Sequence, residues 1–205
     1  MNSRLKVKEA EEKAKIIFGG NFIGLFEACA VLGRNLKEKE LNSFASFSLN
    51  EEELKRYAAE NFILLTVPVR MTVEEIFAVA PKLFIFNLSD REIISLKKEI
   101  IKPGRYLVKK EPKRLSFNGL MMREMGMRPD ENPKLAEAMY VYALTYLAGK
   151  RRMLIEKICI LCREEVERRF GKTHLCFQKD VDTAIKIGAW PSQIPNPSIF
   201  PIKRA

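Results

Sequence analysis

One helical segment, residues 133–148, is apolar on almost every side, and it restricts the fold more than any other part of the chain. Pro133 suits the first helical position, with Asn132 as the cap before it, and Gly149 ends the segment. A helix of this kind must be covered on most sides, so we expect it to be the buried centre of the protein. At helical spacing, two adjacent apolar faces are formed by Leu135, Met139, Tyr142 and Tyr146, and by Ala136, Tyr140, Ala143 and Leu147.

Local signals predict further helices and strands around this segment. Helices are expected at residues 4–18, before Gly19-Gly20, and at residues 22–32. The charged stretch from Arg163 to Phe170 is also predicted to be helical. Capping boxes predict three more helix starts, at Asn50 with Glu53, Thr72 with Glu75, and Ser89 with Glu92. Short strands are predicted at residues 62–69, 106–109 and 175–178, and the mixture indicates an α+β fold.

The length of 205 residues and the hydrophobic content of 47% allow one sizeable core. We therefore predict a single globular domain over residues 1–205. The proline-rich tail, residues 190–205, is expected to pack on this domain, because Trp190 and its apolar neighbours are costly to leave in water. A division of the chain near residues 115–132, where four Met and several turn formers gather, is the alternative.

Positive charge is concentrated in the second half of the chain. Residues 1–96 contain 13 Lys/Arg against 14 Asp/Glu, a net charge of −1. Residues 97–205 contain 23 against 12, a net charge of +11, which gives the whole chain its charge of +10. This asymmetry indicates an anionic partner, with nucleic acid favoured.

The densest basic block, Lys97 to Arg114, holds eight Lys/Arg and two Glu. Tyr106 and Phe117 lie close to it in sequence and are candidates for stacking on a base. No recognised nucleic-acid motif accompanies the block, so a solvated basic face is one alternative, and a structural or protein-interaction module that docks through the tail is another. Phosphate contacts without choice of base sequence are expected from Arg105, Lys109, Lys110, Lys113 and Arg114.

A metal-dependent nuclease is the catalytic alternative to this binding role. Glu111-Pro112-Lys113 has a Glu-x-Lys form, and Asp90 lies upstream. In such a site two carboxylates hold Mg²⁺ and the Lys assists a water molecule. Pro112 argues against it, because a strand would use the backbone donor that proline lacks. The preferred prediction is therefore a non-catalytic protein with no cofactor.

The four cysteines raise the question of a zinc site. Cys159, Cys162, His174 and Cys176 form two pairs of soft ligands. If residues 158–162 form a strand, however, Cys159 and Cys162 point to opposite faces, and the alternative is that these cysteines belong to the core. Without an export signal or a stretch long enough to span a membrane, the cysteines are expected to be reduced thiols in the cytoplasm, with no membrane partner.

Three stretches carry a loose family resemblance. They are residues 80–84 (Ala-Pro-Lys-Leu-Phe), residues 106–112 (Tyr-Leu-Val-Lys-Lys-Glu-Pro), and Pro133 followed by Ala136, Tyr140 and Tyr146-Leu147-Ala148. In these stretches the chain resembles a group of short, uncharacterised bacterial proteins predicted from reduced candidate-phylum genomes. The resemblance covers the middle half of the chain and implies a bacterial cytoplasmic origin. It implies no activity, because the group has none assigned.

Overall fold

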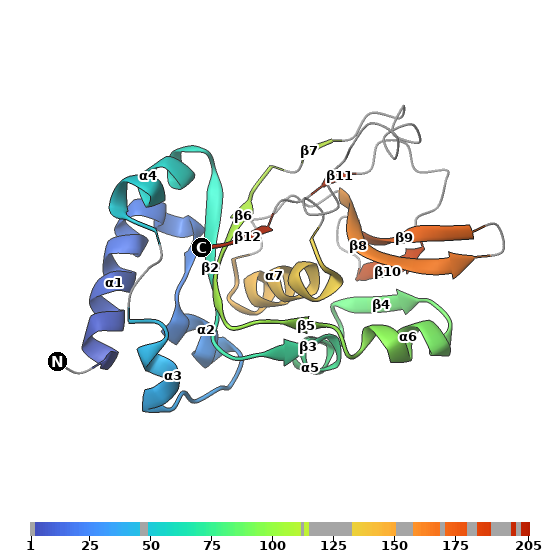
Figure 1. Ribbon diagram of the computed structural model, residues 1–205, viewed down its shortest axis with the longest axis horizontal. Coiled ribbons are helices and arrows are strands. Elements are labelled where there is room, and N and C mark those ends of the chain that lie inside the picture. The colour runs from blue at the N-terminus through green and yellow to red at the C-terminus, as the bar shows by residue number, and fades with distance from the viewer. Residues whose placement is uncertain are drawn as a thin grey trace.

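The computed structural model describes residues 3–45, 49–111, 113–114, 133–150, 158–168, 171–179, 184–189, 198–199 and 202–205, and at some strand positions it describes only the backbone. The α+β class predicted from the sequence is confirmed (Figure 1). The helices are α1 (Ser3–Phe18), the 3₁₀ turn η1 (Gly19–Asn21), α2 (Leu25–Val31), α3 (Glu38–Asn42), α4 (Glu51–Ala59), α5 (Val73–Val79), α6 (Asp90–Leu96) and α7 (Leu135–Leu147). The strands are β1 (Phe22–Ile23), β2 (Phe62–Val67), β3 (Met71–Thr72), β4 (Phe84–Asn87), β5 (Ile100–Ile101), β6 (Gly104–Lys109), β7 (Lys113–Arg114), β8 (Ile158–Arg168), β9 (Gly171–Lys179), β10 (Ile185–Ala189), β11 (Ser198–Ile199) and β12 (Ile202–Arg204).

A four-stranded sheet in the order β1-β2-β6-β12 lies between two helical layers (Figure 1). Alternate residues of β2 explain the layering, because neighbouring side chains of a strand point to opposite faces. Phe62 and Leu64 pack with Leu107 against α1 and α4. Ile63 and Leu65 pack into the larger core that contains α7. Every residue of β2 is therefore buried, as its continuous apolar sequence predicts.

The central helix α7 has ten buried residues among its 13. It contacts α2, α5 and β5 as well as β8 and β9 of the second sheet, so it is covered on most sides, as predicted. The buried hydroxyl of Tyr140 donates a 2.7 Å hydrogen bond to the carbonyl oxygen of Thr66 in β2. The helix begins at Leu135 with Lys134 as its cap, two residues later than predicted, and Asn132 lies outside the described residues.

The second sheet has six strands in the order β4-β10-β9-β8-β11-β7, and a two-stranded pair joins β3 to β5. The prediction of a helix at residues 163–170 is wrong, because residues up to Arg168 belong to β8. Backbone pairing with β9, from Glu165 with His174 to Arg168 with Gly171, overrides the helical preference of the charged side chains. Residues 22–32 also differ from prediction, because Phe22 and Ile23 form β1 before α2 begins.

The chain's C-terminal segment runs antiparallel beside the segment that contains β6 and β7. It joins both sheets, since β12 pairs with β6 whereas β11 pairs with β7 and β8. The partners are Arg114 with Ser198, Lys113 with Ile199, Val108 with Ile202, Leu107 with Lys203, and Tyr106 with Arg204. Two segments more than 80 residues apart in sequence therefore lie side by side.

Candidate anion-binding surface

Backbone pairing brings basic residues from both of these segments together. We call residues 109–114 and 203–204 the basic ribbon; it contains Lys109, Lys110, Lys113, Arg114, Lys203 and Arg204, with Glu111 as its acidic residue. Lys203 and Arg204 of β12 lie opposite Leu107 and Tyr106 of β6, whereas Lys113 and Arg114 of β7 lie opposite Ile199 and Ser198 of β11. Both faces of the four-stranded sheet carry buried apolar side chains, so an outside partner has access to the β12 edge and the strand ends rather than to a face.

Lys109 and Lys110 lie at the end of β6 and are both half-buried. The Lys109 ammonium lies 5.4 Å from the centroid of the Phe62 ring, which orients the side chain without neutralising its charge. The backbone N–H of Lys110 donates to the carbonyl oxygen of Asn61 at 3.1 Å, and this bond fixes where β6 ends. Of Lys113 and Arg114 the structure describes the strand pairing alone.

Arg105 does not belong to the exposed surface, in contrast to the sequence prediction. It is only 5% exposed, and its guanidinium donates a 2.6 Å hydrogen bond to the carbonyl oxygen of Phe44. Burial lowers the pKa of Arg105 to about 10, and the charge of Glu11 opposes the shift. Because side chains alternate along β6, Arg105 faces the layer of α1 to α3, where it cannot reach a phosphate backbone.

Tyr106, predicted as a stacking side chain, is also buried. Its hydroxyl donates to the carbonyl oxygen of Lys102 at 2.8 Å, and burial raises the pKa of Tyr106 to about 12. Phe117, the other candidate, lies outside the described residues. Of the two aromatic residues predicted to stack on a base, the one that the structure describes, Tyr106, is thus unavailable.

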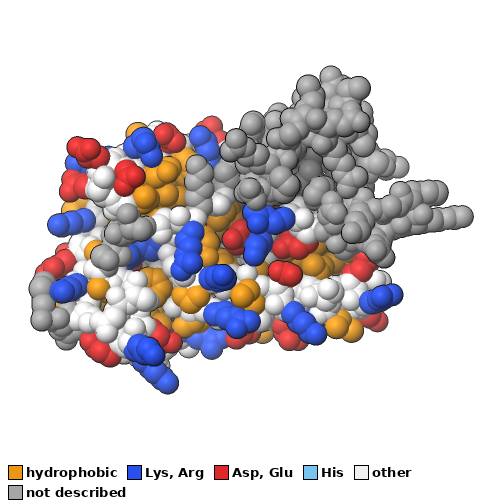
Figure 2. Space-filling model, in the orientation of Figure 1, with side chains coloured by type: hydrophobic (Ala, Val, Ile, Leu, Met, Phe, Trp, Pro, Cys, Tyr) orange, Lys and Arg blue, Asp and Glu red, His pale blue; other side chains and the backbone are white. Residues whose placement is uncertain are grey.

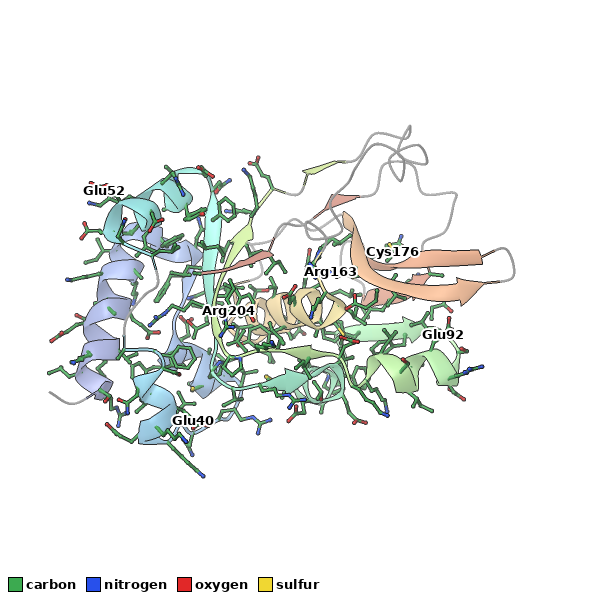
Figure 3. The ribbon with its side chains drawn as sticks, in the orientation of Figure 1. Glu40, Glu52, Glu92, Arg163, Cys176 and Arg204 are labelled. Atoms are coloured by element: carbon green, nitrogen blue, oxygen red, sulfur yellow. The ribbon has the colours of Figure 1, made fainter. Side chains whose placement is uncertain are left out.

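Arg204 is the basic residue that sequence reasoning missed. It is an exposed residue of β12 (Figure 3), and its guanidinium donates to the carbonyl oxygen of Pro103. In the sequence, Arg204 stands out only as part of the Lys203-Arg204 pair after a proline-rich stretch. Nothing in this local pattern indicates that the pair lies beside β6. Figure 2 shows several Lys and Arg side chains over the middle of this face, interleaved with acidic ones.

The residues of the nuclease alternative do not form a common metal site. Asp90 begins α6, whereas Glu111 follows β6 and accepts a 3.3 Å hydrogen bond from the side-chain amide of Asn61. Figure 1 shows α6 and the connection between α4 and β2 well apart. Across the described ranges, no three His, Cys, Asp or Glu side chains are grouped closely enough to hold a metal ion.

The cysteines likewise do not provide a zinc site within the described part of the chain. Cys176 is buried and disulfide-bonded, so the expectation of four reduced thiols is wrong for this residue (Figure 3). Cys162 is completely buried as a free thiol, and burial raises its pKa well above the usual value. Cys162 is therefore a core residue and not a metal ligand, whereas the side chains of Cys159 and His174 lie outside the described ones. The cytoplasmic location stays a prediction, and the disulfide at Cys176 gives it no support.

A groove of about 360 Å³ lies between α1 and α4, away from the basic ribbon. Its charged rim has both signs, with Lys6 and Lys13 against Glu9 and Glu51. A rim of balanced charge favours no anionic ligand, so this groove adds nothing to the surface described above. None of the helices that the structure describes is long and apolar enough to cross a membrane.

Two half-buried carboxyl groups that bind the start of α7 were also missed from the sequence. Glu164 accepts a 2.8 Å hydrogen bond from the backbone N–H of Leu135, and Glu137 accepts one of 2.9 Å from that of Lys134. Burial raises the pKa of both carboxyl groups, that of Glu164 to about 7. No sequence signal linked Glu164 to α7, because its partner lies 29 residues earlier.

Comparisons with protein-family models, with curated proteins and with solved structures gave no match. The resemblance to candidate-phylum bacterial proteins therefore stays a prediction. The functional argument below depends on the geometry and charge of this chain alone.

Proposed function

We propose that this protein binds the phosphate backbone of a nucleic acid through the basic ribbon, without catalysing a reaction. The observation that carries the proposal is the pairing of the C-terminal segment with the segment of residues 106–114, which adds Lys203 and Arg204, opposite Leu107 and Tyr106, to the basic residues of that segment. Several cations carried by two neighbouring chain segments suit contacts with successive phosphates of a polynucleotide. With Tyr106 buried, the binding we expect is governed by charge and has no base preference.

The two ribbon lysines whose side chains are described differ from several other cations of the protein in having no ion pair. Acidic partners neutralise cations outside the ribbon, in the pairs Arg34–Glu75, Lys55–Glu51, Arg56–Glu60, Lys97–Glu74 and Lys150–Glu27. Among the described side chains, neither Lys109 nor Lys110 is in an ion pair. The charge of these lysines is thus available to an outside anion.

Charge reversal of Lys109, Lys110 and Lys113 to Glu tests the proposal. Fluorescence anisotropy with labelled single- and double-stranded DNA and RNA measures affinity across a range of salt concentrations. The wild-type protein should bind at low salt and lose affinity steeply as salt rises. The triple variant should lose about 100-fold or more in affinity, and the slope of log affinity against log salt should fall by about 3.

A matched control separates the position of the charges from their number. Lys8, Lys15 and Lys39 are exposed lysines of α1 and α3, and reversing all three changes the net charge by the same amount. This control should retain most of the affinity. Equal losses in the two triple variants, or no binding of the wild-type protein at low salt, would rule out a nucleic-acid site on the ribbon.

A further inference from the structure

A row of aromatic and basic side chains continues from the end of the basic ribbon onto α4. Phe62, the first residue of β2, lies opposite Lys109 in the β2–β6 pairing, and the Lys109 ammonium lies 5.4 Å from the centroid of the Phe62 ring. The ring of Tyr57 in α4 packs against Phe62 nearly edge-on, with a centroid distance of 5.1 Å and an interplanar angle of 76°. The guanidinium carbon of Arg56 lies over the Tyr57 ring, 5.0 Å from its centroid. These contacts form a continuous row, which we call the aromatic row.

The backbone between α4 and β2 fixes the aromatic row beside the ribbon. A two-residue corner, Glu60-Asn61, joins the helix to the strand (Figure 1). Asn61 has a positive φ of 64°, a conformation that asparagine adopts more readily than most residues. Its carbonyl oxygen accepts from the N–H of Lys110 at 3.1 Å, and its side-chain amide donates to the carboxyl group of Glu111 at 3.3 Å. Both bonds hold the corner against the ribbon, so Tyr57 keeps a fixed place near the ribbon lysines.

Tyr57 is the ring of the aromatic row that an outside ligand can reach. Phe62 is only 4% exposed, whereas Tyr57 is half-buried and packs on the apolar core beneath α4. Arg56, which lies over the Tyr57 ring, has 60% of its side chain exposed, and its ion pair with Glu60 spans 4.0 Å. Stacking of a base on an aromatic ring is stronger than a cation–π contact at such an exposed site, so a base can displace the guanidinium from the ring.

We propose that Tyr57 stacks on a base of the bound nucleic acid, and that the partner of the basic ribbon is therefore a single strand. This inference rests on the proposed function, because phosphate contacts by the ribbon bring the strand to Tyr57. A single strand presents the faces of unpaired bases, whereas a duplex keeps its bases stacked inside the helix. Every base has such a face, so stacking adds affinity to the phosphate contacts without adding sequence preference.

Binding of a single strand and of a duplex by the full chain tests the proposal. The probe is a labelled thymidine oligonucleotide of about 15 nucleotides, alone or annealed to its complement, and fluorescence anisotropy measures the affinity. Tyr57→Leu should weaken single-strand binding about tenfold and leave duplex binding within about twofold of wild type, because only the single strand stacks on the ring. Tyr57→Phe keeps the ring and should retain both affinities.

Tyr146→Leu is the matched control for loss of a tyrosine ring. Tyr146 is also partly exposed, at 37%, but it belongs to α7, which packs on the opposite face of the four-stranded sheet from α4. This variant should bind both probes as the wild-type protein does. A loss of single-strand affinity as large as that of Tyr57→Leu would contradict a specific role for Tyr57.

The outcomes separate this inference from the proposed function. No binding of either probe by the wild-type protein would contradict both. Salt-dependent binding that Tyr57→Leu leaves unchanged, or weakens equally for single strand and duplex, would overturn the stacking role alone. Photocrosslinking of the wild-type protein to a single strand that contains iodouracil decides the matter even if Tyr57→Leu does not fold. We expect the crosslinked peptide to contain Tyr57, and crosslinks at other residues only would overturn the proposal.

Discussion

The starts of helices α4 and α7 use the same chemistry in opposite surroundings. At α4, the side chain of Asn50 accepts from the N–H of Glu53, and Glu53 accepts from the N–H of Asn50, both at 2.9 Å and near solvent. At α7, Glu164 of β8 reaches the first helical N–H from a different element and is half-buried. The comparison teaches that a helix cap within one segment costs little desolvation. A cap between two elements removes the carboxyl group from water and so raises its pKa.

The start of α2 resembles that of α7 and extends the comparison. Glu11 in α1 is only 8% exposed and accepts hydrogen bonds from the N–H groups of Leu25 and Phe26. Burial raises its pKa, while these bonds and the charge of Arg105 lower it. Helices α2 and α7 are therefore each held at the first turn by a glutamate from a distant element, Glu11 buried and Glu164 half-buried. The following predictions test how such caps differ from local ones.

The largest effect is expected from Gly24→Ala at the cap of α2. An alanine Cβ at this position would lie 2.7 Å from the Glu11 carboxyl carbon, so Glu11 would have to move and lose its bonds to the helix. Losing a buried hydrogen bond of a charged group costs about 2 kcal/mol, which should appear as a lower free energy of unfolding in urea. Gly20→Ala is the matched control, because its Cβ would meet no atom within 4 Å. Similar stability of the two variants would show that Glu11 is not held in place.

The next effect concerns Glu164→Gln and its dependence on pH. The folded-state pKa of Glu164, about 7, lies above that of an unfolded chain, so the folded protein binds the proton more tightly. Its contribution is therefore fully present at low pH and is lost as pH rises toward 7. Removing the charge should stabilise the protein at pH 8.5 relative to wild type by about 1 to 2 kcal/mol and change little at pH 5. Thermal unfolding at several pH values measures this, and a difference between the two proteins that is constant with pH would contradict it.

A smaller loss is expected from Asn50→Ala at the cap of α4. The substitution removes the acceptor for the Glu53 N–H, but water can replace it because the cap lies near solvent. Loss of an N-cap side chain typically costs about 1 kcal/mol. Urea unfolding at pH 5.5 and at 8.5 should give the same loss. A loss as large as that of Gly24→Ala would remove the distinction between local and distant caps.

The smallest effect is expected from Lys55→Gln in α4. This substitution removes the ion pair between Lys55 and Glu51, which lies one helical turn before it. The hydrogen bond and charge of Lys55 lower the pKa of Glu51, but both side chains are exposed to water and screened by salt. The midpoint of thermal unfolding should not change measurably at physiological salt. A clear decrease would show that surface charge contributes to the α4 region more than its cap does.

Local patterns in the sequence determined the helix starts and the identity of the central helix. The capping boxes at Asn50, Thr72 and Ser89 are all present, because each depends on residues three positions apart. The apolar faces of residues 135–147 required burial whatever their partners were. The prediction of an α+β fold followed from these short-range signals and the strand at residues 62–67.

Tertiary structure alone decided which distant residues meet. Pairing with β9 made residues 165–168 a strand, and Glu164, in the irregular stretch between Leu161 and Glu165, binds the start of α7. Strand alternation removed Arg105 from the basic surface, while pairing of β12 with β6 added Arg204. The physical reason is that capping and helix periodicity involve neighbours in sequence, whereas burial, strand pairing and the pKa of a carboxyl group depend on contacts between segments far apart along the chain.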